Sequence, residues 1–143
     1  MLLGEYRHNL DPKGRVAVPA KFRDKLGAGA IVTRGLDNCL FVFAGEEWGK
    51  LSEKLMNLPL AQANSRAFVR LMLAGAMDAE LDAQGRILVP DYLRKYAGLS
   101  KEVVLTGLMN RIELWDSATW ERYKQKTESA SEEIAERLGE LGI

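Results

Sequence analysis

Basic side chains gather near the N-terminus of the 143-residue chain, at a spacing suited to binding phosphate groups. Residues 1–27 contain six Lys or Arg and three Asp or Glu, a net charge of +3. Lys and Arg neutralise nucleic-acid phosphates and release counterions, and an Arg can also donate paired hydrogen bonds to a guanine edge. The pattern predicts a phosphate-binding surface, although the whole chain is neutral, with 20 basic and 20 acidic residues. The candidate contacts in this segment are Arg7, Lys13, Arg15, Lys21 and Arg23.

Groups that could serve an enzyme are scarce. His8 is the only histidine, which leaves neither a His-based metal site nor a Ser-His-Asp arrangement within one chain. Cys39 is the only cysteine; pairing with His8 as a nucleophile is conceivable, but no motif supports it, and a small buried side chain is expected there. Lys13-Gly14 lacks the glycine-rich run of a phosphate loop. We therefore predict no enzymatic activity, metal, cofactor or small-molecule substrate.

The strongest signal in the chain is an internal repeat. The segment LDPKGRVAVP at residues 10–19 recurs as LDAQGRILVP at residues 81–90, an offset of 71. The match continues at Arg23 and Arg94, and after one inserted residue it runs on through Trp48 and Trp120. Turn residues and apolar residues are both kept, so the chain consists of two copies of one unit.

Both copies predict the same succession of elements. Asp-x-x-Gly is a type I turn pattern, found as Asp11 to Gly14 and as Asp82 to Gly85, with the glycine supplying a left-handed residue. A strand follows each turn, with alternate side chains on opposite faces, and a short helix follows each Val-Pro. A hairpin and a second helix complete each unit, which predicts an α+β fold.

Four regions are expected along the chain. Two modules flank a linker helix in which Ser65 would form the cap, and the last region is an acidic helix with a net charge of −4. The stripe of Ile134, Leu138 and Leu141 in that helix predicts a docking face between or within subunits. The predicted boundaries are 5–58 for the first module, 59–76 for the linker, 77–127 for the second module and 128–143 for the C-terminal helix.

Composition places the chain among globular proteins. Apolar residues make up 47% of it, and no apolar run approaches the roughly 18 residues that a membrane span needs. One cysteine cannot form an internal disulfide, and no secretory signal is visible at the N-terminus. We therefore expect a cytoplasmic protein without a membrane partner.

The doubled motif Leu-Asp-x-x-Gly-Arg-x-x-Val-Pro, with an Arg four residues after the Pro, resembles the swapped-hairpin DNA-binding module of AbrB, SpoVT and the MazE antitoxins. Two copies, opening with Leu3-Gly4-Glu5-Tyr6 and carrying Glu113-Leu114-Trp115-Asp116 near the end, are similar to the MraZ family from Leu3 to about Thr127. The resemblance implies a pseudo-dimeric swapped-hairpin β-barrel with flanking helices. It also implies a cytoplasmic, nucleoid-associated transcription factor that binds double-stranded promoter repeats of the division and cell-wall gene cluster. Ring-shaped homo-oligomers, in the octamer or dodecamer range, belong to the same implication.

The two copies differ in charge around their shared Asp-x-x-x-Arg signature. Copy one carries most of the basic side chains, so we expect the main DNA surface there, with Arg15 contacting bases. Arg86 is also a candidate DNA contact, although we expect it mainly to brace its turn. One exchange runs the other way, from Asp24 to Lys95. The losses of charge from copy one to copy two are Arg7 to Asp78, Lys13 to Gln84, Lys21 to Tyr92 and Lys25 to Tyr96.

Two alternatives remain open from the sequence. The pairs Asp11–Arg15 and Asp82–Arg86 can be ion pairs that only stabilise their turns, with Gly14 and Gly85 structural in either case. The chain can also be an antitoxin-like assembly scaffold without specific DNA binding, because an acidic tail and self-association suit such a protein equally well.

Overall fold

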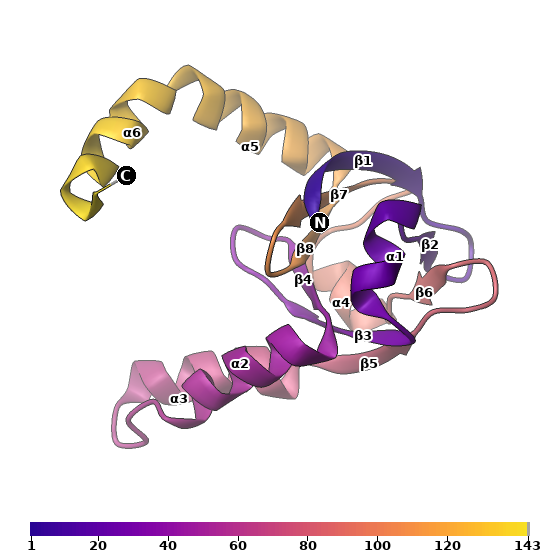
Figure 1. Ribbon diagram of the computed structural model, residues 1–143, viewed down its shortest axis with the longest axis horizontal. Helices are drawn as coiled ribbons and strands as arrows, with labels where there is room; N and C mark the ends of the chain where they lie inside the picture. Colours follow the sequence, from indigo (N-terminus) through magenta and orange to yellow (C-terminus); the bar gives the residue numbers. More distant parts are fainter. Residues whose placement is uncertain (143) are drawn as a thin grey trace.

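The computed structural model describes residues 1–142, and it is an α+β fold built on antiparallel strands, as predicted. Six strands form one sheet in the order β1-β7-β8-β4-β3-β5, and two more form a separate pair, β2-β6 (Figure 1). The strands are β1 (Leu3–Asn9), β2 (Arg15–Ala17), β3 (Gly29–Arg34), β4 (Leu40–Phe43), β5 (Met77–Glu80), β6 (Arg86–Leu88), β7 (Glu102–Leu108) and β8 (Ile112–Asp116). The helices are α1 (Ala20–Leu26), α2 (Gly45–Met56), α3 (Ala63–Val69), α4 (Asp91–Tyr96), α5 (Ser117–Ser129) and α6 (Ser131–Leu138).

The two copies exchange strands with each other. Strand β1 of copy one pairs with β7 of copy two, while β5 of copy two pairs with β3 of copy one. The short strands β2 and β6 pair across the copies, with Val16 opposite Ile87. Neither copy therefore completes its sheet alone. The six-stranded sheet is open, with β1 and β5 at its edges, so its hydrogen bonding does not form the closed barrel that the resemblance implied.

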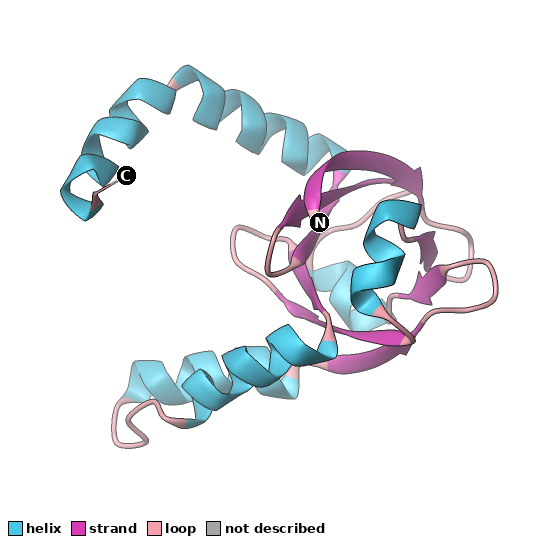
Figure 2. Ribbon diagram, in the orientation of Figure 1, coloured by secondary structure: helices cyan, strands magenta, loops and turns pink. Residues whose placement is uncertain are grey.

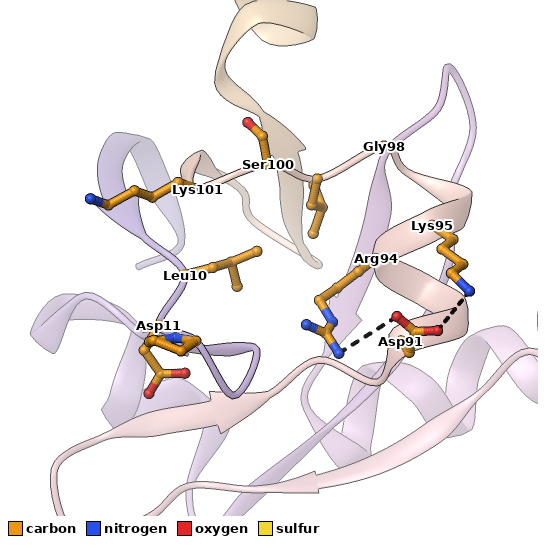
Figure 3. Close-up of a pocket in the computed structure, with 10 residues that line it drawn as sticks. Leu10, Asp11, Asp91, Arg94, Lys95, Gly98, Ser100 and Lys101 are labelled. Carbon is orange, nitrogen blue, oxygen red and sulfur yellow. Dashed lines mark ion pairs between the residues drawn. The ribbon is translucent and has the colours of Figure 1, made fainter.

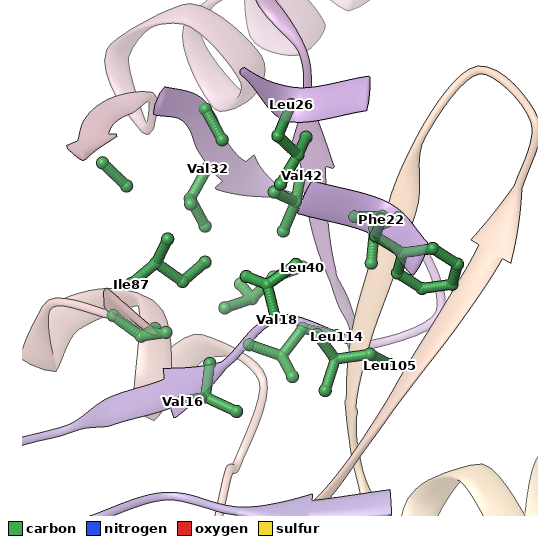
Figure 4. Packing of buried hydrophobic residues seen from close by; sticks show 14 of the residues in the cluster. Val16, Val18, Phe22, Leu26, Val32, Leu40, Val42, Ile87, Leu105 and Leu114 are labelled. Atoms are coloured by element: carbon green, nitrogen blue, oxygen red, sulfur yellow. The ribbon is translucent and has the colours of Figure 1, made fainter. Parts of the chain in front are cut away.

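One core is shared by both copies (Figure 4). Val16 and Ile87 are at most 1% exposed, which confirms that alternate residues of β2 and β6 point inward. Phe22 of α1 and Leu93 of α4 are fully buried against the same core. Because the inward positions are apolar, their neighbours Arg15 and Arg86 are left on the opposite, solvent-facing side of the pair.

The predicted turns are confirmed in both copies. The Gly14 N–H donates to the Asp11 carbonyl and the Gly85 N–H to the Asp82 carbonyl, each at 2.9 Å, and both glycines have positive φ. Each glycine also lies under an arginine of the other copy. A Cβ at Gly14 would stand 2.7 Å from Cζ of Arg94, and a Cβ at Gly85 would collide with Arg23. The left-handed backbone conformation therefore favours glycine at both positions, and a side chain there would also displace the arginine that lies over it.

Two helical arms leave the sheet on the side away from β2 and β6 (Figure 2). One arm is α2 with α3 and a π-helical turn, Arg70–Ala74, and the other is α5 with α6 and a 3₁₀ turn, Gly139–Leu141. A second apolar cluster, which includes Phe43, Leu55 and Trp115, joins both arms to the outer face of the sheet. None of the helices in residues 1–142 has the length and apolar character that crossing a membrane would require.

Two predictions about the arms were wrong in detail. The linker region 59–76 is not one helix capped at Ser65, because α3 begins at Ala63 and has Gln62 at its N-cap position. The C-terminal region 128–143 is not one helix either, since α5 continues to Ser129 and the chain bends at Ala130. Residue 143 of that region lies outside the described residues.

Candidate nucleic-acid interface

The solvent face of the β2-β6 pair brings both signature arginines together. Antiparallel pairing sets Arg15 opposite Leu88 and Ala17 opposite Arg86. These four side chains share one face because Val16 and Ile87 between them point into the core. The turns Asp11–Gly14 and Asp82–Gly85 lead directly into the two strands, so the face has one turn from each copy beside it. We call the four residues and the two turns the ribbon face.

Arg15 is held in place by its own turn. Its Nε donates to Oδ2 of Asp11 at 2.5 Å, and Oδ1 of Asp11 accepts the backbone N–H groups of Lys13 and Arg15 at 2.9 Å. Among residues 1–142 no hydrogen bond is formed by the terminal Nη groups of Arg15. A carboxylate thus fixes the stem of the guanidinium while two donor groups stay free, the arrangement needed for a paired contact with an acceptor edge.

Arg86 repeats this geometry and adds a contact between the copies. Its Nε donates to Oδ2 of Asp82 at 2.9 Å, and its Nη1 lies 3.6 Å from Oδ2 of Asp11. Asp11 therefore sits between the two arginines, and it attracts one terminal nitrogen of Arg86 through an ion pair that is too long to be a hydrogen bond. The bracing ion pairs considered from the sequence are present in both copies, but the ribbon face places Arg86 beside Arg15 rather than on a separate surface.

Both aspartates of the signature are stabilised as carboxylates. The pKa of Asp11 lies below its usual value chiefly because the backbone N–H of Arg15 donates to it, and the Arg15 side chain and the Lys13 N–H act in the same direction. The pKa of Asp82 is lowered by the matching donors of Arg86 and Gln84. Each aspartate therefore keeps its negative charge and its hold on the arginine at neutral pH.

The other predicted contacts are not all at this face. Lys13 lies in the turn of copy one and is exposed, and Lys21 is exposed on α1. Arg23 is half-buried, donates from Nε to the carbonyl of Val18 at 2.8 Å and covers the opposite turn. Arg7 faces α5, where its guanidinium pairs with Glu121 and donates to Ser117 at 2.8 Å. Arg7 is therefore separated from the cluster that the sequence assigned to it.

Ala17 and Leu88 belong to the ribbon face although no sequence signal marked them. Repeat comparison aligns the two residues with each other, but it does not reveal that β2 and β6 pair. The half-buried Ala17 and the exposed Leu88 give the face an apolar component beside its arginines. Apolar side chains of this kind can contact the thymine methyl group in a major groove.

The remaining candidate groups do not form a reactive site. Cys39 is fully buried, and burial raises the pKa of its thiol, so it stays protonated and shielded. His8 lies on β1, outside the apolar cluster that holds Cys39. In the part of the chain that the structure describes, no group of three or more His, Cys, Asp or Glu could hold a metal ion.

Comparison with known proteins agrees with the doubled motif. The family model described as "MraZ protein, putative antitoxin-like" matches twice, at residues 1–71 and 72–140. A protein of Halothermothrix orenii named transcriptional regulator MraZ is 53% identical over 143 residues, covering all of both chains. Proteins with the same name from Natranaerobius thermophilus and Caldanaerobacter subterraneus are 52% and 49% identical, again over the full length of both. A solved structure, PHS018 from Pyrococcus horikoshii, has a TM-score of 0.34 at 16% identity and covers 80% of this chain and 88% of its own.

These relatives carry the name of a transcriptional regulator, which is not an enzyme class. Two matches to one family model also confirm that the chain contains an internal repeat. With relatives near half identity over its whole length and both copies of the family model in place, the chain belongs to the MraZ family of transcriptional regulators.

Proposed function

We propose that the protein is a sequence-specific DNA-binding regulator and that the ribbon face is its DNA contact. The observation that carries this proposal is Arg15, whose Nε is fixed by Asp11 while its terminal nitrogens are free. Arg15 contacts base edges, and Lys13 in the adjoining turn contacts a phosphate. Lys21 and Arg23 add positive charge from α1. Arg7 plays no part, since its guanidinium is engaged by α5.

The second copy contributes less to recognition than the first. The Nη1 of Arg86 lies within ion-pair distance of Asp11, and Gln84 stands where copy one has Lys13. Arg86 therefore mainly orders the two turns relative to each other and adds charge beside Arg15. This arrangement keeps the predicted asymmetry between the copies while placing both on one DNA-facing surface.

The proposed target is the promoter of the division and cell-wall gene cluster, including the promoter of the protein's own gene. This target rests on family membership together with the ribbon face, and it implies a cytoplasmic, nucleoid-associated protein. We also retain the predicted modules, 5–58 and 77–127, with 59–76 as linker and 128–143 as tail. In this proposal the six-stranded sheet and the β2-β6 pair enclose a common core as a pseudo-dimeric arrangement of swapped hairpins, without hydrogen bonds in residues 1–142 that close them into one barrel.

Several subunits are proposed to bind repeated sites as a ring. The stripe on α6 and the 3₁₀ turn after it is not buried within the chain, since Ile134, Leu138 and Leu141 are 41%, 38% and 72% exposed. At the tip of the other arm an apolar groove of about 260 Å³ is lined by residues that include Met56 and Leu60.

The groove and α6 are complementary in charge as well as in polarity. Arg66 and Arg70 are the charged residues that line the groove, whereas residues 128–143 have a net charge of −4. The α6 arm of one subunit would pack its apolar stripe into the groove of the neighbouring subunit. Its glutamates would then lie beside these arginines. A head-to-tail contact of this kind closes into a ring when the rotation permits.

Binding to DNA from upstream of the protein's own gene tests the function directly. We expect a specific complex whose affinity falls steeply with salt, because several Lys and Arg contacts release counterions from phosphates. Fluorescence anisotropy titrations at several salt concentrations measure this, with a scrambled fragment of equal length as the control. Equal affinity for both fragments, or binding that ignores salt, would favour the assembly scaffold instead.

A further inference from the structure

A cavity of about 790 Å³ lies next to the ribbon face, between the turn of copy one and α4 of copy two (Figure 3). Leu10, Asp11 and Pro12 form one wall, and α4 with the segment 98–101 forms the other. Arg94 projects between these walls, with Asp91 and Lys95 beside it, while Lys101 lies at the far end of the second wall and its side chain points outward. The cavity therefore gathers three basic side chains at a junction of the two copies.

Arg94 has unused hydrogen-bonding capacity in this cavity. Its Nε is buried and has no hydrogen-bond partner among the described residues, and its Nη2 reaches Asp91 only at 3.8 Å. The matched Arg23 in copy one is satisfied, because its Nε donates to the Val18 carbonyl at 2.8 Å. A buried donor without an acceptor is unfavourable and commonly indicates a water or an ion that completes the site.

The carboxylates lining the cavity are already engaged. Asp91 accepts an ion pair from Lys95 at 3.0 Å, and Asp11 is occupied by Arg15 and two backbone N–H groups. Lys101 forms no ion pair within residues 1–142, and it is exposed. The positive charges of Arg94 and Lys101 are thus not fully balanced by the carboxylates that line the cavity.

The differences between the copies support a role for this charge. From copy one to copy two most basic residues near the signature are lost, yet Asp24 is replaced by Lys95. Lys101 likewise stands where copy one has the uncharged pair Gly29-Ala30. Loss of charge at the turn and gain of charge at the cavity fit a second anion site of different geometry.

We propose that this cavity binds a phosphate group carried by a larger molecule, with Arg94 and Lys101 as its ligands. Several acceptor oxygens on one atom suit a guanidinium and an ammonium that belong to different parts of one wall, with the exposed Lys101 side chain turning inward to reach the phosphate. The volume leaves room for whatever carries the phosphate. The source is either the DNA backbone beside the ribbon face, which rests on the proposed function, or a free phosphorylated molecule.

One arm of the test omits DNA. Thermal melts of the full-length protein are compared in pyrophosphate and in sodium chloride of equal ionic strength. For wild type we expect pyrophosphate to raise the melting temperature by about 4 °C more than chloride does. Arg94→Gln should lose this difference and the matched Arg23→Gln should keep it. Lys101→Gln, at an exposed position, should reduce it even if Arg94→Gln folds poorly.

The other arm measures the salt dependence of binding to DNA from upstream of the protein's own gene. If a DNA phosphate occupies the cavity, Arg94→Gln lowers the slope of log affinity against log salt by about one per bound subunit. That result assigns the site to DNA with or without a pyrophosphate effect. A lost pyrophosphate effect with an unchanged slope assigns it to a free phosphorylated molecule.

An unchanged slope, with a pyrophosphate effect that is absent or equal in all variants, overturns the proposal. If wild type binds no operator, the proposed function fails, and the pyrophosphate arm alone still decides whether the cavity takes phosphate.

Discussion

Replacing Arg15 with alanine is expected to abolish discrimination between operator and scrambled DNA while leaving the protein folded. A paired contact between Arg and a base is worth about 1–3 kcal/mol, so each subunit should lose about tenfold or more in specific affinity. The ion pair with Asp11 is partly open to solvent and contributes little to stability. Operator titrations and thermal melts measure the two effects separately.

Arg86→Ala is the matched comparison, because each arginine follows an equivalent turn and donates from Nε to the aspartate of that turn. We expect it to keep most of the specific affinity, since the ion pair with Asp11 draws Nη1 of Arg86 inward and the neighbouring turn has Gln84 in place of Lys13. Its melting temperature should stay within about 4 °C of wild type, because Asp82 still accepts the backbone N–H groups of Gln84 and Arg86 itself. Equal loss of binding in the two variants would show that both copies contact bases.

Placing aspartates at Leu138 and Leu141 is expected to break the ring. Both side chains are exposed within the chain, so the change should leave the fold of each subunit intact. It should remove apolar surface from the contact between subunits. Apparent affinity for DNA with several repeats should then fall about 100-fold or more, because simultaneous engagement of neighbouring sites is lost. Affinity for a single repeat should change little.

Met109→Asp is the matched control for the ring. Met109 is 54% exposed, lies outside both arms and has a positive φ that aspartate tolerates. It should leave the mass of the assembly unchanged in light scattering. Wild-type protein that is already a monomer at micromolar concentration, without DNA, would contradict the oligomer.

The elements that the sequence predicted correctly are those determined by local interactions. In the turn Asp11–Gly14, the Asp11 side chain, the backbone groups that it binds and the left-handed Gly14 lie within a few residues of one another. The local sequence is therefore enough to determine the turn. Alternation in β2 similarly showed which side faces the core. The short helix expected after Val18-Pro19 is α1, with Pro19 at its N-cap position.

The features that the sequence did not reveal depend mainly on partners distant in the chain. Alternation sets the face of a strand but not the strand beside it, so the β2-β6 pairing and the position of Arg86 beside Asp11 could not be derived. Arg7 was grouped with Arg15 because they are near in sequence, but its partner Glu121 lies 114 residues away. The predicted cap at Ser65 was wrong for a different reason. The N-cap position is Gln62, at the end of the turn that connects α2 to α3.

The central claim, that DNA lies on the ribbon face, is tested most directly by site-specific disulfide cross-linking. Ala17→Cys places a thiol opposite Arg86 on this face without removing a charge, and the native Cys39 is too buried to compete. The comparison is Gln125→Cys, an exposed position on α5, which extends away from β2 and β6 (Figure 1). Binding through the ribbon face predicts that operator DNA carrying a tethered thiol links to Ala17→Cys and not to Gln125→Cys. Equal linkage at both positions, or linkage only at α5, would contradict it.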